Sequence, residues 1–451
     1  MSDPKQDVTM EKIVSLAKRR GFVFPSSEIY GGLSSAWDYG PLGSELKNNI
    51  QRFWWREMTQ LNDNIVGLDA SIMMHPKVWE ASGHVSGFSD KMVEDTVTNE
   101  RMRWDHLTEE QRETRTSPKG NPLSEPRDFN LLFKTHLGPT EESGSTVYLR
   151  PETAQGSYVN FKNVVQTSRM KLPFGIAQVG KAFRNEIVTK NFIFRTCEFE
   201  QMEMQYFVKP GEDEEWFEHW KQMRMDYYKR LGIRPEYLRF SEHGPDELAH
   251  YAKKAFDIEY YYPFGWQELE GIHNRTDFDL SRHAEFSGKD LRYLEEETKE
   301  RYIPYIVETA VGLTRSVLVA LCDAYEEEEV AENDVRTVLR FHPEVAPITV
   351  GVFPLVKKDG LAELAREIER ELRLDFTTFY DQGGAIGRRY RRQDEIGTPF
   401  GITVDYETKE NQTVTLRFRD SMEQVRVPVE ELVDRIRHEI RNYQRPGVEH
   451  A

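Results

Sequence analysis

The sequence predicts two units in one chain, an α+β unit followed by a smaller α/β unit. Its 451 residues exceed the roughly 250–300 residues at which a single core stops growing. Strand-like patterns dominate residues 147–207. After Pro343, strand and helix patterns alternate over about 100 residues, a normal domain size. We therefore expect a multidomain α+β and α/β protein, with domains at residues 1–342 and 343–451.

The first unit begins with a predicted helix at residues 7–20. A stretch rich in glycine and aromatic residues follows at 21–43, where glycines let the backbone turn tightly. Ser44 is predicted to cap a helix of about four turns. Residues 64–73 predict a strand. Residues 98–130 are polar and interrupted by prolines, so we expect a surface insertion there.

Strand patterns fill the centre of the first unit. The runs at 174–179 and 195–208 flank a loop at 188–191 and predict a hairpin. A helical pattern at 212–231 indicates a second insertion, over residues 209–255. Further strands are expected at 257–262, 266–271 and 303–309, and a helix at 312–325. In the second unit we expect strands at 348–355, 375–380 and 400–406, and helices at 361–372, 386–396 and 430–443.

The composition narrows the class of protein. A net charge of −17 argues against general coating of nucleic acid, because phosphate binding needs clustered cations, but a local basic face remains open. The densest cationic run is at 388–392. Acidic runs at 212–218, 295–300 and 326–332 are predicted to be solvated helix faces.

The cysteines and the apolar runs indicate a compartment. Cys197 and Cys322 are too few for a disulfide scaffold or for a zinc site with paired Cys-x-x-Cys ligands. No apolar run approaches the roughly 20 residues that span a bilayer. The first seven residues lack the pattern of a secretory signal. We therefore expect a cytoplasmic protein with no membrane partner.

An arginine and a glutamate two residues apart, Arg184 and Glu186, follow the apolar run at 174–179. On a strand, residues i and i+2 point to the same face. A guanidinium suits a phosphate and a carboxylate suits an amine, so the pair can hold a nucleotide at both ends. By itself this spacing more often indicates an ion pair across one strand face.

Three further features suit the same chemistry. A carboxylate, Glu152, follows a strand, and residues 194–203 alternate aromatic and charged side chains. A strand enters a helix through glycine at 312–315, which brings in Arg315. Two arginines can meet a triphosphate from two sides, and Phe199 offers a platform for a base. Taken singly, Glu152 is more often an exposed strand residue, and Phe199 a core residue.

The sequence contains neither of the two commonest nucleotide-binding motifs. No GxxxxGK[ST] occurs, and no GxGxxG lies between a strand and a helix. A P-loop or Rossmann site is therefore not expected.

Together these motifs resemble the class II aminoacyl-tRNA synthetases. Motif 1 of that class is similar to residues 44–76, motif 2 (Phe-Arg-x-Glu) to 183–186, and motif 3 (Gly-x-x-Arg) to 312–315. The strings between the motifs resemble the bacterial homodimeric glycyl-tRNA synthetases in particular, at 20–25, 29–32, 37–43, 149–156, 198–203 and 271–277. The resemblance implies an antiparallel-sheet catalytic domain, an anticodon-binding domain, and dimerisation through residues 44–76.

The resemblance also implies functional residues. Arg184, Glu186 and Arg315 take the catalytic positions. The ATP contacts fall on Arg184, Asn185, Glu186, Phe194, Arg195, Thr196, Cys197, Glu198, Phe199, Glu268, Leu269, Gly312, Leu313, Thr314 and Arg315. The glycine contacts fall on Arg103, Glu152, Phe199, Glu200, Gln201, Met202, Glu203, Glu308, Thr309, Ala310, Val311 and Gly312. Mg²⁺ would be held through ATP by Glu268 and Glu308, and the anticodon by Arg388, Arg389, Tyr390, Arg391 and Arg392.

The sequence departs from the family pattern at two places. Ala310 stands where members of the family often carry serine. Residues 97–100 hold no cysteine where many members carry Cys-x-x-Cys, so zinc is not expected.

The implied activity is ligation of glycine to tRNA through glycyl-adenylate, with ATP and Mg²⁺. Crowded carboxylates at Glu152, Glu203 and Glu308 would bind the glycine ammonium and leave no apolar hole for a side chain. Two alternatives stay open. One is a synthetase-like protein that binds RNA or a protein partner without charging tRNA, and the other is an enzyme that activates alanine or serine.

Overall fold

The centre of the molecule is a seven-stranded sheet, seen in a computed structural model that describes residues 4, 8–33, 35–139, 146–186, 191–245, 248–249 and 251–448. The strand order is β11-β12-β13-β16-β10-β9-β3. Neighbouring strands are antiparallel except β3 and β9, which confirms the predicted antiparallel sheet. The strands are β3 (Ile65–Leu68), β9 (Phe174–Phe183), β10 (Glu198–Val208), β11 (Leu238–Glu242), β12 (Lys254–Tyr262), β13 (Gly265–Thr276) and β16 (Tyr305–Gly312).

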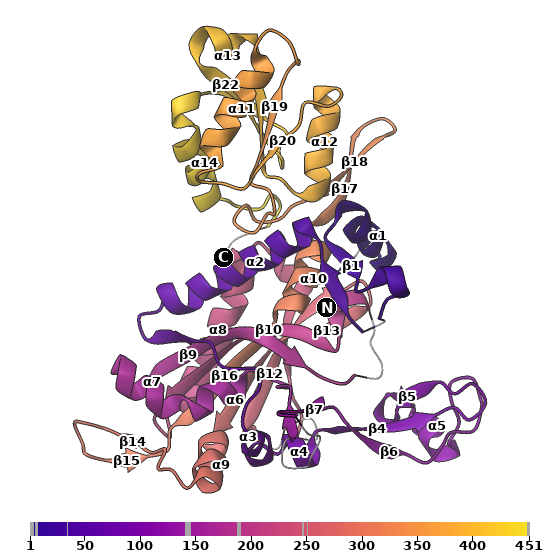
Figure 1. The fold of residues 1–451 in the computed structure, drawn as a ribbon, viewed down its shortest axis with the longest axis vertical. Helices are drawn as coiled ribbons and strands as arrows, with labels where there is room; N and C mark the ends of the chain where they lie inside the picture. The colour runs from indigo at the N-terminus through magenta and orange to yellow at the C-terminus, as the bar shows by residue number, and fades with distance from the viewer. Residues whose placement is uncertain are drawn as a thin grey trace.

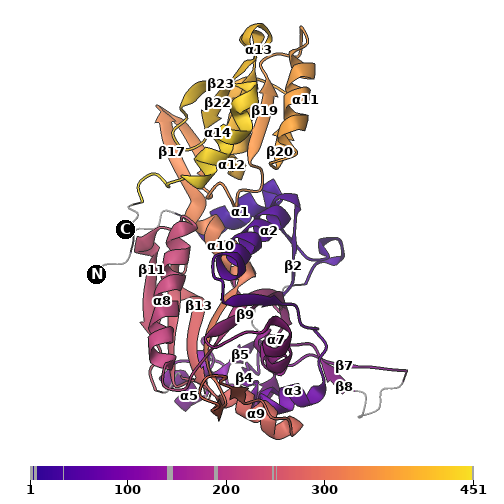
Figure 2. The same ribbon diagram turned by 90° about the vertical axis from the view of Figure 1, so that its left-hand side faces the viewer.

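The two faces of β10 have different surroundings, because successive side chains of a strand point to opposite faces. Met202, Met204 and Tyr206 belong to the largest hydrophobic core. Helices α2 (Pro41–Trp55), α8 (Asp213–Arg230) and α10 (Leu313–Ala324) contribute to the same core, and Figure 2 shows α8 lying along the sheet. The alternate residues Gln201 and Glu203 line a pocket instead. Hydrophobic packing on one face therefore leaves polar side chains on the other.

The N-terminal elements lead into this core. Helix α1 (Met10–Arg20) starts after Thr9, whose hydroxyl accepts a hydrogen bond from the Lys12 amide (3.3 Å), and ends at Gly21 with φ 76°. Strands β1 (Val23–Pro25) and β2 (Trp37–Tyr39) pair, and β7 (Lys134–His136) pairs with β8 (Thr146–Tyr148). Helix α2 begins at Pro41, three residues before the predicted cap. In the described part of the chain, no helix has the length and apolar character needed to cross a bilayer.

Five short helices gather near the other end of the sheet, in the lower part of Figure 1. They are α3 (Pro76–Ala81), α4 (His84–Gly87), α6 (Ala154–Val159), α7 (Phe161–Ser168) and α9 (Phe278–Ser287). Helices α6, α7 and α9 share a core that includes the stacked rings of Phe161, Phe174 and Phe207, and α3 and α4 pack in a separate cluster around Trp79. Helix α6 packs on β9 and β10, and α3 packs on α9. These contacts hold the residues just before α6 against the sheet.

A small three-stranded sheet, β5-β4-β6, projects beside this end (Figure 1). It comprises β4 (Ser89–Glu94), β5 (Arg101–Arg103), β6 (Arg127–Asn130) and helix α5 (Glu109–Thr114). Val93, Leu107 and Leu123 form its own core. Its strand β4 precedes the predicted insertion at 98–130, and the insertion boundaries remain a prediction.

The second unit is a five-stranded sheet of order β20-β19-β21-β22-β23 and lies at the top of Figure 1. Strands β20, β19 and β21 are parallel, and the other pairs are antiparallel. The alternation confirms the predicted α/β class. The elements are β19 (Val350–Pro354), α11 (Leu361–Leu372), β20 (Thr378–Tyr380), α12 (Ile386–Ile396), β21 (Phe400–Val404), α13 (Tyr406–Asn411), β22 (Thr413–Phe418), β23 (Gln424–Pro428) and α14 (Leu432–Arg441).

Two of the three acidic runs were wrongly predicted as helix faces. Residues 326–332 form most of β17 (Tyr325–Ala331), which pairs with β18 (Asp334–Leu339). There Glu326 meets Arg340 at 2.6 Å, and Glu328 meets the buried Arg336. Residues 295–300 connect β14 (Tyr293–Leu294) to β15 (Arg301–Tyr302). Charge density alone did not reveal the strand alternation, or the arginines it faces.

Candidate functional site

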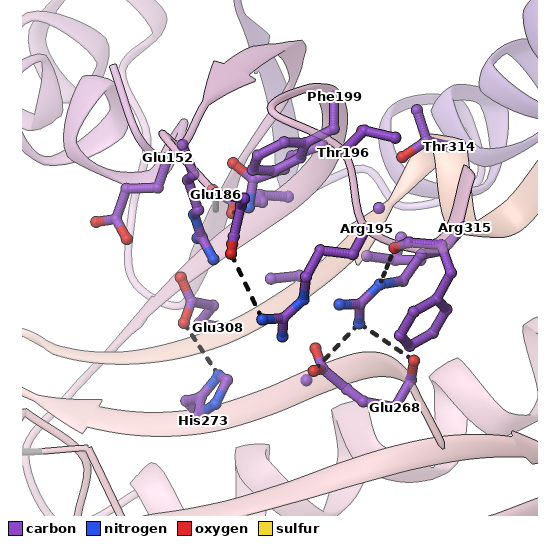
Figure 3. A pocket seen from close by; sticks show the side chains of 18 of the residues that line it. Glu152, Glu186, Arg195, Thr196, Phe199, Glu268, His273, Glu308, Thr314 and Arg315 are labelled. Carbon is purple, nitrogen blue, oxygen red and sulfur yellow. Dashed lines mark hydrogen bonds and ion pairs between the residues drawn. The ribbon is translucent and has the colours of Figure 1, made fainter. Parts of the chain in front are cut away.

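The principal pocket opens on the polar face of the seven-stranded sheet and has a volume of about 240 Å³. Figure 3 shows its two ends, with Glu152 and Glu308 on one side and Arg315 with Glu268 on the other. The residues that line it come from β10, β13, β16, the segments that follow β9 and β16, the turn before α6 and the segment before β12. They are Glu152, Arg184, Glu186, Phe194, Arg195, Thr196, Phe199, Gln201, Glu203, Tyr251, Glu268, Gly271, His273, Arg275, Glu308, Ala310, Val311, Gly312, Thr314 and Arg315.

The buried carboxylate of Glu308 has Arg275 and His273 as close partners. Its Oε2 accepts from Arg275 Nη1 at 2.9 Å and lies 3.1 Å from His273 Nδ1. Its Oε1 accepts from Gln205 Nε2 at 2.8 Å. Burial opposes its ionisation, but Arg275 and His273 lower the pKa of Glu308 to about 2. Glu308 is therefore ionised at neutral pH.

Among the described residues, the second buried carboxylate, Glu203, accepts hydrogen bonds only from neutral donors. Thr153 Oγ1 donates to Oε2 at 2.6 Å, and Gln201 Nε2 donates to Oε1 at 2.7 Å. Burial first, and then the charges of Glu308 and Glu152, raise the pKa of Glu203 to about 8. This carboxyl is therefore the one for which a new cation in the pocket would make the largest difference.

The third carboxylate, Glu152, lies in the turn before α6. Its Oε1 accepts from Gln155 Nε2 at 2.8 Å, and its Oε2 lies 3.4 Å from His84 Nε2. Burial opposes ionisation, but His84 and then Arg275 hold the pKa of Glu152 well below its usual range. Glu152 is thus an ionised wall of an acidic pit that also contains Glu203 and Glu308.

Arg275 organises the floor of this pit. The side chain is 2% exposed, forks onto Asp279 at 2.8 and 2.9 Å, and lies 3.7 Å from the centre of the Tyr251 ring. No functional role was predicted for Arg275, Tyr251, Gly271 or His273. For Arg275 the signal was an arginine four residues before an aspartate, within a string that resembles the family.

Arg184 and Glu186 line the pocket just after the end of β9. The Arg184 guanidinium lies between the rings of Phe88 and Phe199, at 5.4 and 5.3 Å from their centres, and its Nε donates to the Pro151 carbonyl at 3.0 Å. Strand β9 ends at Phe183, so Arg184 and Glu186 follow the strand and do not share a strand face as predicted. Both nevertheless line the pocket.

Arg315 is positioned where β16 passes into α10. Its Nη1 lies 3.1 Å from Glu268 Oε2, its Nε donates to the Phe194 carbonyl at 3.4 Å, and its guanidinium lies 4.5 Å from the centre of the Phe194 ring. Arg315 lowers the pKa of Glu268. Arg315, Arg184 and Arg195 all line the pocket, and their guanidinium groups make it suitable for an anion.

Nine of the residues predicted to bind ATP or glycine do not line the pocket. Met202 and Thr309 alternate onto the other face of their strands, Leu269 and Leu313 are core residues, and Glu200 pairs with Lys47. Arg103 pairs with Asp90 and Asp105 at 3.0 and 2.7 Å. The full set outside the pocket is Arg103, Asn185, Cys197, Glu198, Glu200, Met202, Leu269, Thr309 and Leu313. Of the hairpin loop at 188–191, residues 188–190 lie outside the described residues.

The two carboxylates predicted to assist Mg²⁺ differ in availability. Both oxygens of Glu308 already accept hydrogen bonds from Gln205 and Arg275. Glu268 is half exposed at the anion-binding end and can offer one oxygen, which suits a cation that also uses phosphate oxygens. Among the described residues no group of three or more His, Cys, Asp or Glu side chains is placed to hold a metal. Glu268 fits the role better than Glu308.

In the second unit, helix α12 divides the residues predicted to bind the anticodon. Arg389 is buried and donates to the carbonyls of Pro354 (2.7 Å) and Asp381 (3.1 Å), and the buried Tyr390 hydroxyl meets Thr403. These two side chains lie in the interior of the domain, so we do not include them among the residues proposed to contact the anticodon. Arg388 and Arg392 are exposed, and Arg391 is half buried.

Two family models match the chain in the same order as its two largest sheets. The tRNA synthetase class II core domain (G, H, P, S and T) matches residues 133–324, and the anticodon binding domain matches residues 349–439. A solved prolyl-tRNA synthetase from Cryptosporidium parvum, complexed with L-proline and AMP, is similar with a TM-score of 0.63 over 95% of this chain and 77% of that chain. At 15% identity this likeness shows the fold alone.

Curated relatives match the chain from end to end. It is 65% identical to the glycine–tRNA ligase of Treponema denticola over 99% of this chain and 100% of the relative. It is 59% identical to that of Borreliella burgdorferi over 97% and 98%, and 57% identical to that of Treponema pallidum over 97% and 100%. With this identity and coverage, the chain belongs to the glycine–tRNA ligase family of the class II aminoacyl-tRNA synthetases.

Proposed function

We propose that this chain activates glycine with ATP to form glycyl-adenylate and then transfers the glycyl group to the 3′ end of its tRNA. One observation carries the proposal. Three buried carboxylates, Glu152, Glu203 and Glu308, meet in a pocket whose other end presents Arg315, and Arg184 lines the same pocket beside Pro151. An acidic end suits an ammonium and a cationic end suits phosphates, so the pocket matches an amino acid and ATP side by side.

The acidic pit favours the smallest amino acid. The glycine ammonium can bind between Glu152 and Glu203, and the walls there are carboxylates and amides with no apolar hollow. A larger side chain would clash with these groups and remove water from their charges without replacing it. Ala310 adds only a methyl group to this region, so its side chain offers no hydrogen bond to a serine hydroxyl.

The first step is an in-line displacement at phosphorus. A glycine carboxylate oxygen forms a bond to the α-phosphorus of ATP, and pyrophosphate leaves with the electrons of the broken P–O bond. Arg184 and Arg315 would bind the phosphates and stabilise their growing charge, while Phe199 offers a platform for the base and Glu186 an acceptor for the adenine amine. Class II synthetases typically use ATP with Mg²⁺, which adds further positive charge at the phosphates, and Glu268 is the residue best placed to hold it.

In the second step a ribose hydroxyl of the tRNA attacks the glycyl carbonyl, and AMP leaves. No side chain forms a covalent intermediate in this scheme. Cys197 has no part in it, because its thiol lies against the Glu186 carbonyl outside the pocket. The side chains serve to position the reactants and to stabilise charge.

The second unit is proposed to bind the anticodon, with Arg388, Arg391 and Arg392 on the outer side of α12. Arginines recognise single-stranded loops by stacking on bases and by hydrogen bonding to them. The proposal also includes domain limits at 1–342 and 343–451, dimerisation through residues 44–76, a cytoplasmic location and the absence of zinc. These points rest on the family resemblance and the composition.

ATP–pyrophosphate exchange measured with each of the twenty amino acids, followed by charging of tRNA, tests this function. We expect exchange with glycine alone, and glycyl-tRNA when tRNA is added. Exchange that is strongest with alanine or serine would overturn the choice of substrate. Absence of exchange with every amino acid would leave a protein that binds RNA without activating an amino acid.

A further inference from the structure

His84, at the start of α4, lies outside the pocket lining and contacts Glu152, one of the three carboxylates of the acidic pit. Its Nε2 lies 3.4 Å from Glu152 Oε2, and its Nδ1 lies 2.7 Å from Ser82 Oγ. The ring packs edge-on against Trp79 and Phe88, with ring centres at 5.6 and 5.1 Å. The side chain is 12% exposed. His84 is therefore held on several sides while one nitrogen faces a carboxylate of the site.

The hydrogen bonds around His84 form a chain with a direction. Ser82 Oγ donates to the Trp79 carbonyl at 3.3 Å, so its lone pairs are available to a donor at His84 Nδ1. Nδ1 faces Ser82 and Nε2 faces Glu152, so each ring nitrogen of His84 has a polar group within reach.

This chain fixes the orientation of the Glu152 carboxylate. Gln155 Nε2 donates to Oε1 at 2.8 Å, and His84 Nε2 lies beside Oε2. One partner on each oxygen restrains rotation about the terminal bond of the side chain, which is otherwise broad. Each oxygen keeps a lone pair for a ligand. Removal of His84 would leave Oε2 buried with no partner on that side, which disfavours the ionised form.

We propose that His84 is a positioning residue, which holds the Glu152 carboxylate in the orientation that receives the glycine ammonium. The inference rests on the proposed function, because it assigns a support to the glycine end of that site. His84 would act through Glu152 and would not itself contact glycine. Its loss should therefore weaken the use of glycine and leave the use of ATP nearly unchanged.

Steady-state pyrophosphate exchange on the full chain tests this inference, with the KM for glycine and the KM for ATP measured separately. His84→Phe keeps a ring for Trp79 and Phe88 but removes both nitrogens. It should raise the KM for glycine by about tenfold or more, the expected size for a lost hydrogen bond to a charged group, and the KM for ATP by less than about threefold. His84→Gln, which restores an amide donor, should recover much of the loss.

Val85→Ala is the matched control, because Val85 lies on the same short helix and packs in the neighbouring apolar cluster. It should leave both KM values near those of the wild type. His84→Ala repeats the measurement if the phenyl ring is not accommodated. A parallel rise of both KM values, an unchanged KM for glycine, or the same effect from Val85→Ala would overturn the inference. If the wild type shows no glycine-dependent exchange, the proposed function itself fails, and that outcome is separate.

Discussion

Arg275 Nη1 donates to Glu308 Oε2 across 2.9 Å at the floor of the acidic pit, while the rest of the guanidinium forks onto Asp279. All three side chains are almost fully buried. One cation thus compensates two carboxylates at the floor of the pocket. The carboxyl groups left without this cation as a direct partner are Glu152 and Glu203.

Replacing Arg275 with glutamine should destabilise the fold. The change leaves Glu308 and Asp279 buried without their cation, and breaking a buried ion pair in this way costs about 3–5 kcal/mol. We expect the free energy of unfolding in urea to fall by about that amount for the transition that includes the first unit. The variant should also lose glycine-dependent exchange.

Arg435→Ala is the control for this prediction. Arg435 pairs with Glu439 at 2.8 Å on helix α14, but its side chain is 45% exposed, and exposed pairs contribute little. Its unfolding curve should stay close to that of the wild type. A wild-type unfolding curve for Arg275→Gln would show that the buried pair is not required.

Arg184→Ala should abolish adenylate formation without unfolding the protein. The side chain lines the pocket and stacks between Phe88 and Phe199, so its loss removes a phosphate contact but no buried ion pair. We expect exchange to fall by at least about a hundredfold, comparable to the loss of one preorganised donor to a developing charge. The far-ultraviolet circular dichroism should match the wild type. Retained exchange would remove Arg184 from the phosphate role.

Arg184→Lys separates charge from shape in the same position. The lysine keeps the positive charge but cannot stack as a plane between two rings or donate in a fork. We expect partial activity, above that of Arg184→Ala and below that of the wild type. Equal activity in both variants would show that charge alone makes no contribution.

Much of the fold followed from the sequence because its signals are local. Strand alternation, helix periodicity and the glycine at 312 set the order of elements on either side of Pro343, and the antiparallel sheet and the α/β unit were both confirmed. The prediction that the acidic runs at 295–300 and 326–332 are helix faces was wrong, because the density of charge along a sequence does not identify a partner strand. Glu326 and Glu328 face arginines that only the β17–β18 pairing brings near.

The sequence predicted many of the residues that line the pocket, but it did not predict the residues that support them. Residues that touch the pocket directly carry motif spacing, and Glu152, Glu203 and Glu308 do converge there. Residues that support them from behind carry no such spacing. His84 lies 68 positions before Glu152 in the chain and meets it only because α4 packs on α3, α3 packs on α9, and α9 packs on α6. Contiguous ranges such as 198–203 also placed too many residues in the predicted site, because alternate side chains of a strand point to the core.

In the second unit, the double variant Arg388→Ala with Arg392→Ala should weaken tRNA charging while sparing pyrophosphate exchange. Both side chains are exposed on α12. Arg392 contacts Asp381 and the Gly383 carbonyl, each at 2.8 Å, on the surface. Loss of two phosphate or base contacts should raise the KM for tRNA by about tenfold or more. Equal loss of charging and exchange would indicate a structural role for this helix.

Arg389→Ala on the same helix should behave differently. Its guanidinium is 2% exposed and holds the carbonyls of Pro354 and Asp381, so its removal leaves buried acceptors without donors. We expect a lower unfolding midpoint for the second unit, measured by thermal denaturation. If Arg389→Ala left stability unchanged and reduced only the affinity for tRNA, the buried hydrogen bonds of this residue would make no contribution to the stability of the second unit.

Glycine binding should release a proton from Glu203. The pKa of this carboxyl is raised to about 8 by burial and by the charges of Glu308 and Glu152, so it is mostly protonated at about pH 7 before glycine arrives. Among charged neighbours, Arg275 acts in the opposite direction, and Arg150 is held by the carbonyls of Ala70 and Lys181.

An ammonium beside Glu203 favours its ionised form, so binding lowers its pKa and the proton leaves. The sign follows from linkage: glycine affinity should strengthen as pH rises from about 6 to about 8, and the gain should end above the free pKa of Glu203. Titration calorimetry at about pH 7, in two buffers of different ionisation enthalpy, should show release approaching one proton per glycine. Glu203→Gln should abolish the difference between buffers. Identical heats for the wild type in both buffers would mean that Glu203 is already ionised in the free site.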